Sequence, residues 1–157
     1  MGDLNIYNLS FKDITLEKLD VNSPVHISVM ESMRDYTATE MCYDVLRDVE
    51  AEKENRSSRN CFLAKNSNGY FGYINISDDR EGDRILCYII QEKLRGMGLG
   101  KVLLSYVSDY LLDSNIASSV KMYISRKNVA SINVASFCGF EPINYAGGDM
   151  IQYRKTR

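Results

Sequence analysis

The stretch that decides the fold is Ile85–Leu112, which reads ILCYIIQEKLRGMGLGKVLLSYVSDYLL. It opens with six apolar or aromatic residues, Ile85–Ile90, whose high content of β-forming residues predicts a buried strand. After a short polar link comes Arg95–Lys101, which reads RGMGLGK, and then apolar side chains recur at the three-and-four spacing of one helical face. We therefore predict a strand, a glycine-rich turn and a helix over 99–112, in that order.

The glycine-rich turn has the physical properties of an anion-binding site. The first N–H groups of a helix have no partner within the helix, and the helix dipole places partial positive charge at the same end. Glycines allow positive φ and carry no side chain that would hold a ligand away from the backbone. Arg95 and Lys101 add formal positive charge on either side. A phosphate fits such a turn best, and the alternative at this point is a glycine-rich connection that only turns the chain.

The spacing of the glycines excludes the two commonest phosphate-binding motifs. A P-loop needs a glycine five residues before its Gly-Lys pair and Ser or Thr after the lysine, and this chain has Arg95 and Val102 there. The dinucleotide fingerprint GxGxxG needs its third glycine where Lys101 stands. The spacing that fits is R-x-x-G-x-G, formed by Arg95, Gly98 and Gly100.

A second motif follows the next predicted strand. The segment Asn128–Phe140 reads NVASINVASFCGF, and its apolar spacing predicts a short helix with Gly139 as the C-terminal cap. Asn128 and Ser131 are three residues apart, and the segment ends in Gly-Phe. Taken alone, this segment could equally be a capped helix that leads into a strand.

Together the two motifs resemble those of the GNAT superfamily of acyl-CoA-dependent N-acetyltransferases. In that family R-x-x-G-x-G follows an apolar strand, and N-x-x-[AS]-x-x-x-[YF]-x-x-x-G-F follows one helix and one strand later. The resemblance covers roughly residues 60–140. It implies an α/β fold of the α+β type, with a GNAT-like mixed central sheet of six or seven strands flanked by about four helices, and residues 1–157 as one domain.

The rest of the chain agrees with the family's order of elements. A helix is expected from Pro24 to about Tyr36, and a second helical pattern starts after Thr39. Three strands in series joined by short polar turns should form an antiparallel meander, and the strand after the 99–112 helix should lie parallel to the third of them. The expected strands are one near Leu4–Leu9 or Ser10–Leu16, then Asn60–Lys65, Tyr70–Ile76, Ile85–Ile90, Val120–Ile124, Ile143–Tyr145 and Met150–Tyr153.

The resemblance also implies where acetyl-CoA, the acyl donor, would bind. The strands at 85–90 and 120–124 would splay apart and admit the pantetheine arm, and the amides of the glycine-rich turn would hold the diphosphate. A backbone N–H near Ile90 would stabilise the oxyanion that forms when an amine attacks the thioester. The residues implied in binding the cosubstrate are Ile89, Ile90, Arg95, Gly96, Met97, Gly98, Leu99, Gly100, Lys101, Asn128 and Ser131.

The catalytic groups depart from the family pattern. The family's frequent general acid is a tyrosine seven residues after the motif asparagine, and this chain has Ala135 there. Ser131 and Cys138 lie one turn to either side on the same helical face. Tyr123 occupies a place on the preceding strand where some members carry a glutamate base. We take Tyr123 and Cys138 as the candidate catalytic residues; a packed aromatic ring and a buried thiol are the structural alternatives.

Composition narrows the possible classes of function. The chain has 157 residues, 45% hydrophobic and 25% charged, as is typical of a globular domain. Its net charge of −2 argues against a broad nucleic-acid surface. No apolar run approaches the ~18–20 residues of a membrane span, and the N-terminus lacks a signal-peptide core. The four cysteines form no C-x-x-C pair and His26 is the single histidine, which predicts no metal site and a cytoplasmic protein with reduced thiols.

We therefore expect an N-acetyltransferase that moves an acetyl group from acetyl-CoA to a primary amine of a small molecule or peptide. No nucleic-acid or membrane partner is expected, and a homodimer is left open. Because the tyrosine expected at position 135 is missing, a non-catalytic acyl-CoA-binding sensor is the alternative. Acetylation of charged tRNA is disfavoured by the acidic balance. Acidic residues in the first two helices suggest a cationic amine or only a solvated helix face; they are Glu31, Asp35, Glu40, Asp44 and Asp48.

Overall fold

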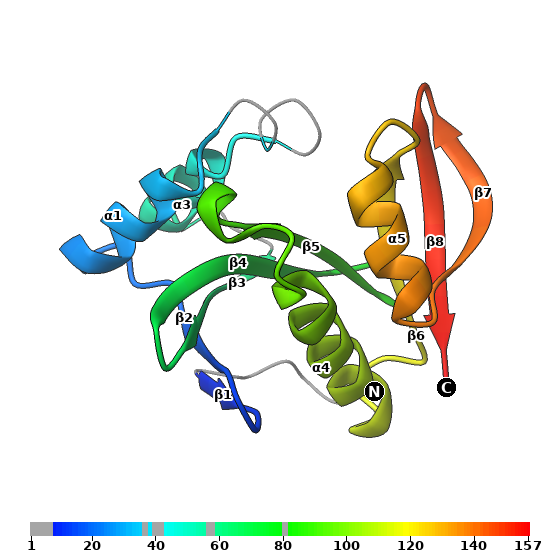
Figure 1. Ribbon diagram of the computed structural model, residues 1–157, viewed down its shortest axis with the longest axis horizontal. Helices are drawn as coiled ribbons and strands as arrows, with labels where there is room; N and C mark the ends of the chain where they lie inside the picture. The colour runs from blue at the N-terminus through cyan, green and yellow to red at the C-terminus, as the bar shows by residue number, and fades with distance from the viewer. Residues whose placement is uncertain (1–7, 36–37, 39–42, 56–58, 80–81) are drawn as a thin grey trace.

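The protein is built on one mixed sheet of eight strands. The computed structural model describes residues 8–35, 38, 43–55, 59–79 and 82–157, and within them the strand order is β1-β2-β3-β4-β5-β6-β8-β7 (Figure 1). The strands are β1 (Asn8–Ser10), β2 (Thr15–Lys18), β3 (Arg59–Asn66), β4 (Gly69–Asp78), β5 (Arg84–Ile90), β6 (Ser119–Ser125), β7 (Glu141–Gly147) and β8 (Met150–Thr156). The predicted fold class is confirmed.

The sheet has more strands than the six or seven expected, because the N-terminal segment forms a hairpin and not one strand. The N–H of Phe11 donates to the carbonyl of Ile14 at 2.8 Å, and this turn separates β1 from β2. The two strands pair antiparallel, with Leu9 opposite Leu16. The part of the predicted strand that falls on residues 4–7 lies outside the described residues.

Four α-helices and one short 3₁₀ turn complete the described fold. The helices are α1 (Pro24–Ser32), α3 (Leu46–Lys53), α4 (Leu99–Asp113) and α5 (Val129–Phe137), and the 3₁₀ turn η1 is Glu92–Leu94. The predicted start of α1 is confirmed, because the Ser23 hydroxyl accepts from the N–H of His26 at 3.2 Å and Pro24 is the first helical residue. The predicted helix start after Thr39 falls on residues outside the described ranges. None of the helices in the described ranges is long and apolar enough to cross a membrane.

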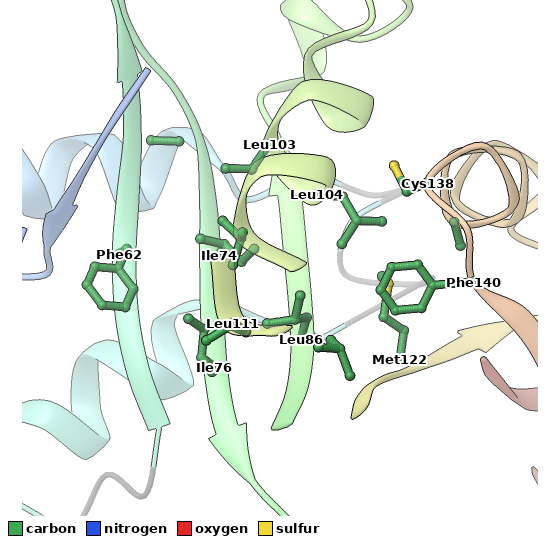
Figure 2. Packing of buried hydrophobic residues seen from close by; sticks show 14 of the residues in the cluster. Phe62, Ile74, Ile76, Leu86, Leu103, Leu104, Leu111, Met122, Cys138 and Phe140 are labelled. Atoms are coloured by element: carbon green, nitrogen blue, oxygen red, sulfur yellow. The ribbon is translucent and has the colours of Figure 1, made fainter. Parts of the chain in front are cut away.

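The two faces of the sheet carry separate hydrophobic cores. The larger core lies between the sheet and the helices α4 and α5, where Leu103, Leu104 and Leu111 of α4 belong to one cluster with Ile74 and Leu86 of the sheet (Figure 2). The smaller core lies on the face covered by α1 and α3, and its fully buried members include Met30, Met33, Leu63 and Tyr73. Consecutive residues of β5 divide between them, since Ile89 belongs to the smaller core and Ile90 to the larger.

The strands β5 and β6 pair at one end and diverge toward the other. They run parallel, but they pair only at Arg84 with Val120 and Ile85 with Lys121. Beyond these pairs β5 continues to Ile90 and β6 to Ser125 without further pairing to each other. The splaying expected of these two strands is therefore present (Figure 1).

A buried ion cluster holds the two strands together at their paired end. The Lys121 ammonium lies 2.7 Å from an Asp79 carboxylate oxygen and 3.1 Å from an Asp83 oxygen. The side chains of Lys121 and Asp83 are only 8% and 4% exposed, and the hydrogen bond to Asp79 is the main reason why the pKa of Lys121 is raised above its ordinary value. The cluster therefore ties the β4–β5 turn to β6.

Candidate active site

The glycine-rich turn lies directly after β5 and opens the helix α4. Gly96 and Gly98 adopt the left-handed conformation, with φ of 80° and 81°, and a Cβ at either position would meet no atom within 4 Å. Glycine is therefore favoured at these two positions because the backbone is left-handed there, and not because a neighbouring atom leaves no room for a side chain. Gly98 is the N-cap of α4, and no side chain caps the first turn of this helix. The start of α4 thus presents backbone amides that no capping side chain has claimed.

The third glycine of the motif has a different physical task. A Cβ at Gly100 would lie 3.3 Å from Cε2 of Tyr88 and 3.5 Å from its hydroxyl oxygen. A side chain at position 100 would therefore have to push the Tyr88 ring away by a few tenths of an ångström. The ring of a β5 residue therefore packs directly beneath the helix start.

The two cationic residues of the motif behave differently. The Arg95 guanidinium makes a bidentate ion pair with Asp35, with Nη1–Oδ1 at 3.2 Å and Nη2–Oδ2 at 2.6 Å. The charge of Arg95 is therefore matched within the protein, whereas the sequence suggested that it faces the anion. The Lys101 ammonium lies 4.6 Å from the centroid of the exposed Phe137 ring, so a positive charge is retained beside the turn.

The backbone at the end of β5 points its N–H groups in alternate directions. The carbonyl oxygen of Ile89 lies 3.0 Å from the position where Gly72 of β4 would carry a Cβ, so this carbonyl faces β4. Because the peptide bond is planar and trans, the N–H of Ile90 in the same peptide unit faces the opposite side, toward β6. The Gln91 N–H then returns to β4 and donates to Phe71 at 2.9 Å. Of the two isoleucines proposed from sequence, Ile90 thus directs its N–H toward the diverging strand.

The second motif forms the start of α5. The side-chain oxygen of Asn128 accepts from the N–H of Ser131 at 3.2 Å, which makes Asn128 the N-cap of this helix. The three-residue spacing of the motif is therefore that of a capping interaction. Both residues are half-buried, and they follow the diverging end of β6.

The two candidate catalytic residues lie on opposite faces of the sheet. Tyr123 of β6 is 41% exposed, while its neighbours Met122 and Ile124 are buried in the larger core, so Tyr123 faces away from that core. Cys138 is 6% exposed and belongs to the larger core, with Ala135 fully buried in the same core. The structure therefore does not bring Tyr123 and Cys138 together.

The thiol of Cys138 is held between α4 and α5. Its Sγ lies 3.5 Å from the carbonyl oxygen of Lys101, to which it donates, and the Ser105 hydroxyl donates to Sγ at 3.3 Å. Burial raises the pKa of this thiol above its ordinary value. These features are those of a protonated structural cysteine.

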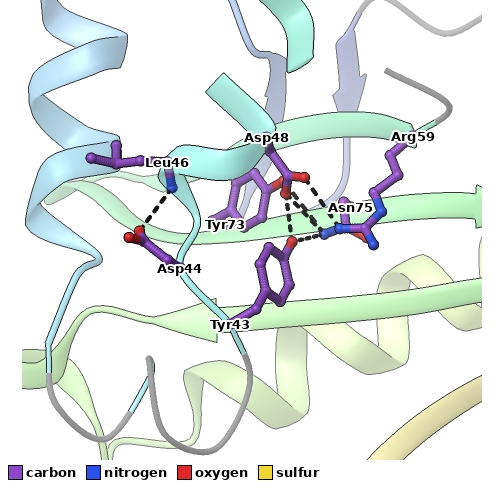
Figure 3. A network of polar contacts seen from close by, with 7 residues as sticks. All are labelled: Tyr43, Asp44, Leu46, Asp48, Arg59, Tyr73 and Asn75. Atoms are coloured by element: carbon purple, nitrogen blue, oxygen red, sulfur yellow. Dashed lines mark hydrogen bonds and ion pairs between the residues drawn. The ribbon is translucent and has the colours of Figure 1, made fainter. Parts of the chain in front are cut away.

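Sequence analysis missed a buried polar network on the face covered by α1 and α3 (Figure 3). Its centre is Asp48 of α3, which is 4% exposed. The carboxylate accepts hydrogen bonds from the hydroxyls of Tyr43 and Tyr73, from Arg59 at 3.2 Å and from Asn75 at 3.4 Å. The available signal was the placement of Tyr73 and Asn75 two residues apart on a strand that is otherwise apolar, since alternate residues share one face.

The network is satisfied and balanced in charge. Burial raises the pKa of both Tyr43 and Tyr73, so the two phenols stay protonated and donate to the Asp48 side chain. The Arg59 guanidinium offsets the charge of that carboxylate. Asn75 stands opposite Cys87 in the β4–β5 ladder, which places the network one strand away from the divergence of β5 and β6.

The acidic residues expected on the first two helices are divided between helix and loop, because Glu31 lies in α1 and Asp48 in α3, whereas Asp35 and Asp44 lie outside both helices. Besides the Asp35–Arg95 and Asp48–Arg59 pairs, Asp44 lies 2.9 Å from Arg34. These three carboxylates are therefore neither a simple solvated face nor an unmatched cation-binding surface. Glu31 is exposed, and Glu40 lies outside the described residues.

Known structures share this fold over nearly the whole chain. An aminoglycoside acetyltransferase AAC(6')-Ib solved with coenzyme A is 19% identical, with a TM-score of 0.75 over 92% of this chain and 95% of that chain. The N-acetyltransferase PseH of Campylobacter jejuni, solved with acetyl coenzyme A, is 16% identical, with a TM-score of 0.69 over 92% of this chain and 99% of that one. A spermidine N-acetyltransferase SpeG chimera from Vibrio cholerae and hSSAT is 12% identical, with a TM-score of 0.72 over 92% and 96%.

A comparison with curated proteins found no match. The family model of the acetyltransferase (GNAT) family, in contrast, matches residues 28–140. This match includes both motifs and the diverging strands between which the cosubstrate was expected. The enzyme class predicted from the two motifs is thereby confirmed, and the chain belongs to the acetyltransferase (GNAT) family.

Proposed function

We propose that the protein transfers the acetyl group of acetyl-CoA to a primary amine of a small molecule or peptide by direct attack. The observation that carries this proposal is the uncapped start of α4 directly beside the divergence of β5 and β6. Neighbours with the same fold were solved with coenzyme A or acetyl coenzyme A, which supports this choice of acyl donor.

Each part of the chain would have one task in this reaction. The amides of Gly96–Lys101 bind the diphosphate, because they combine open donors with the positive end of the helix dipole. The pantetheine arm lies along the end of β5, beside Asn128 and Ser131. The N–H of Ile90 donates to the thioester oxygen and stabilises the negative charge that develops there when the amine attacks.

We propose Tyr123 over Cys138 as the group that exchanges a proton during transfer. Tyr123 is exposed on the diverging part of β6, whereas the Cys138 thiol is buried and engaged between two helices. Tyr123→Phe should lower kcat by up to about 10²-fold, at the low end for general acid–base groups because a thiolate can leave without a proton. Cys138→Ala should lower the melting temperature and leave the pH profile of kcat unchanged. The reverse result would return the role to Cys138.

The paired carboxylates bear on the choice of acceptor. A polycation would need several carboxylates whose charge is not already matched, and three of those on the α1 and α3 side are held by arginines. We therefore propose an acceptor with one primary amine and not a polyamine.

A cytoplasmic location and the pairing of two copies stay predictions. Light scattering of the purified protein measures whether two copies pair.

The test uses purified protein, acetyl-CoA and a panel of monoamines, polyamines, aminoglycosides and short peptides. Amine-dependent release of free thiol supports the enzyme, and the preferred amine defines the acceptor class. Binding of acetyl-CoA without turnover of any amine would favour the sensor alternative. At a hundredfold excess over its dissociation constant, acetyl-CoA should stabilise the fold by about 2.7 kcal/mol, or roughly 5–11 °C in melting temperature. No shift would refute the proposal.

A further inference from the structure

We propose that Arg95 is a positioning residue that couples occupation of the diphosphate turn to the end of α1 through Asp35. This inference rests on the proposed function, because it takes coenzyme A as the ligand of the turn. It assigns the side chain of the first residue in the R-x-x-G-x-G motif a task other than contact with phosphate.

The contacts of Arg95 reach three separate parts of the fold. Its Nε donates to the carbonyl of Ile90 at 3.0 Å, which is the last residue of β5. Its two terminal nitrogens hold both oxygens of Asp35, sixty positions earlier in the chain. The backbone of Arg95 leads into Gly96, so the same residue begins the diphosphate turn. The pair with Asp35 places the turn after β5 next to the segment that follows α1.

Asp35 is itself fixed to the face that α1 and α3 cover. Its side chain is 10% exposed, and its Oδ1 also accepts from the N–H of Ala38 at 2.9 Å. Met33 and Ala38, on either side of it in the chain, are buried in the smaller core together with Ile89 of β5. A movement of Asp35 would therefore disturb the packing on that face.

The coupling follows from the geometry of this ion pair. A guanidinium is planar, and its fork binds a carboxylate in one orientation, so the pair forms only when Arg95 is correctly placed. The exposed glycines at 96 and 98 allow the turn several backbone conformations, and a bound diphosphate selects one of them. Binding at the turn then favours the paired state of Arg95, which fixes Asp35 and the end of α1. Nε of Arg95 meanwhile donates to the carbonyl of Ile90, and the N–H of Ile90 still faces β6.

Hydrogen exchange with mass spectrometry tests this coupling without an amine. Coenzyme A should slow exchange in the turn, 95–101, and also over 31–35, the last turn of α1 and the residues that follow it, by about fivefold or more, the lower limit typical of coupled sites. In Asp35→Asn, protection of the turn should remain and protection at 31–35 should be lost. This variant keeps Arg95, and the amide oxygen can still accept from Ala38. Arg95→Lys should behave in the same way, because lysine keeps the charge but lacks the fork.

Arg34→Gln is the matched control. Arg34 precedes Asp35 in the chain and pairs with Asp44 at 2.9 Å, but this pair does not involve the diphosphate turn. Coenzyme A should therefore protect both segments in this variant, as in the unaltered protein. Protection of the turn alone in the unaltered protein, or unchanged protection at 31–35 in Asp35→Asn, would overturn the coupling. No protection of the turn by coenzyme A would instead refute the proposed function.

Discussion

Gly98→Ala isolates the backbone cost of the glycine-rich turn, residues 95–101. Gly98 has φ of 81° and ψ of 4°, and a Cβ built there meets no atom within 4 Å. The substitution therefore adds no steric clash, and its cost is that of placing an L-residue in the left-handed region, about 1–2 kcal/mol. For a domain of this size each kcal/mol lowers the melting temperature by about 2–4 °C, so the expected loss is about 2–8 °C.

Two variants make this prediction refutable. Gly98→Asn should cost less than Gly98→Ala, because asparagine visits the left-handed region more readily. Gly100→Ala should behave differently, because a helical alanine gains up to about 1 kcal/mol over glycine but its Cβ would press on the Tyr88 ring at 3.3 Å. Urea unfolding and titration with coenzyme A measure stability and binding separately. Equal stability of Gly98→Ala and the unaltered protein would refute the backbone argument, as would an asparagine variant as unstable as the alanine one.

Three further substitutions test the polar contacts that hold the fold. The hydrogen bond from Tyr70 is the main cause that lowers the pKa of Glu17 below its usual 4.5. This contact therefore stabilises the fold above pH 4.5, and the stabilisation is lost as the pH falls through the folded-state pKa. In Tyr70→Phe, the free energy of unfolding measured by urea should fall less below pH 4.5 than it does in the unaltered protein. Tyr73→Phe removes a hydrogen-bond donor to the buried Asp48 carboxyl group and should lower the free energy of unfolding by about 1.5–3 kcal/mol. An unchanged urea midpoint would contradict this. Lys121→Met removes the ammonium that pairs with the buried Asp83 and the half-buried Asp79 and should cost about 3–5 kcal/mol at neutral pH. Urea titrations should show this loss shrinking as the pH is lowered and the carboxylates protonate.

The features predicted from sequence are those set by neighbours along the chain. The strand over 85–90, the glycine-rich turn and the helix from Leu99 each follow from local periodicity and glycine conformation, and all three lie where expected. The sequence did not show that the two glycines have different roles. Gly98 adopts a left-handed backbone conformation, whereas Gly100 leaves space for the Tyr88 ring. The role of Gly100 depends on a contact between α4 and β5, which local sequence does not reveal.

The features that sequence analysis missed depend on contacts between residues far apart in the chain. The partner of Arg95 lies sixty residues away, and the hydroxyl of Tyr73 meets a carboxylate twenty-five residues away. Helical periodicity placed Asp48 on a polar face, and only the packing of α3 on the sheet shows that this face is covered. The N-terminal hairpin was missed for a similar reason, since β2 is fixed by pairing with β3, distant in sequence.

The alternation along β5 links the two faces of the protein to the reaction. Ile90 packs in the larger core and turns its N–H toward β6, while Ile89 packs in the smaller core and turns its carbonyl toward β4. A slip of one residue against β4 would exchange these roles and turn the N–H of Ile90 toward β4, away from the side proposed for the thioester. The register is fixed at the other end of the strand, where the N–H of Asp79 donates to Asp83 at 2.9 Å and Lys121 joins both carboxylates to β6. In the proposed reaction, the geometry of acetyl transfer at the open end of β5 and β6 would thus depend on the ion cluster at their closed end.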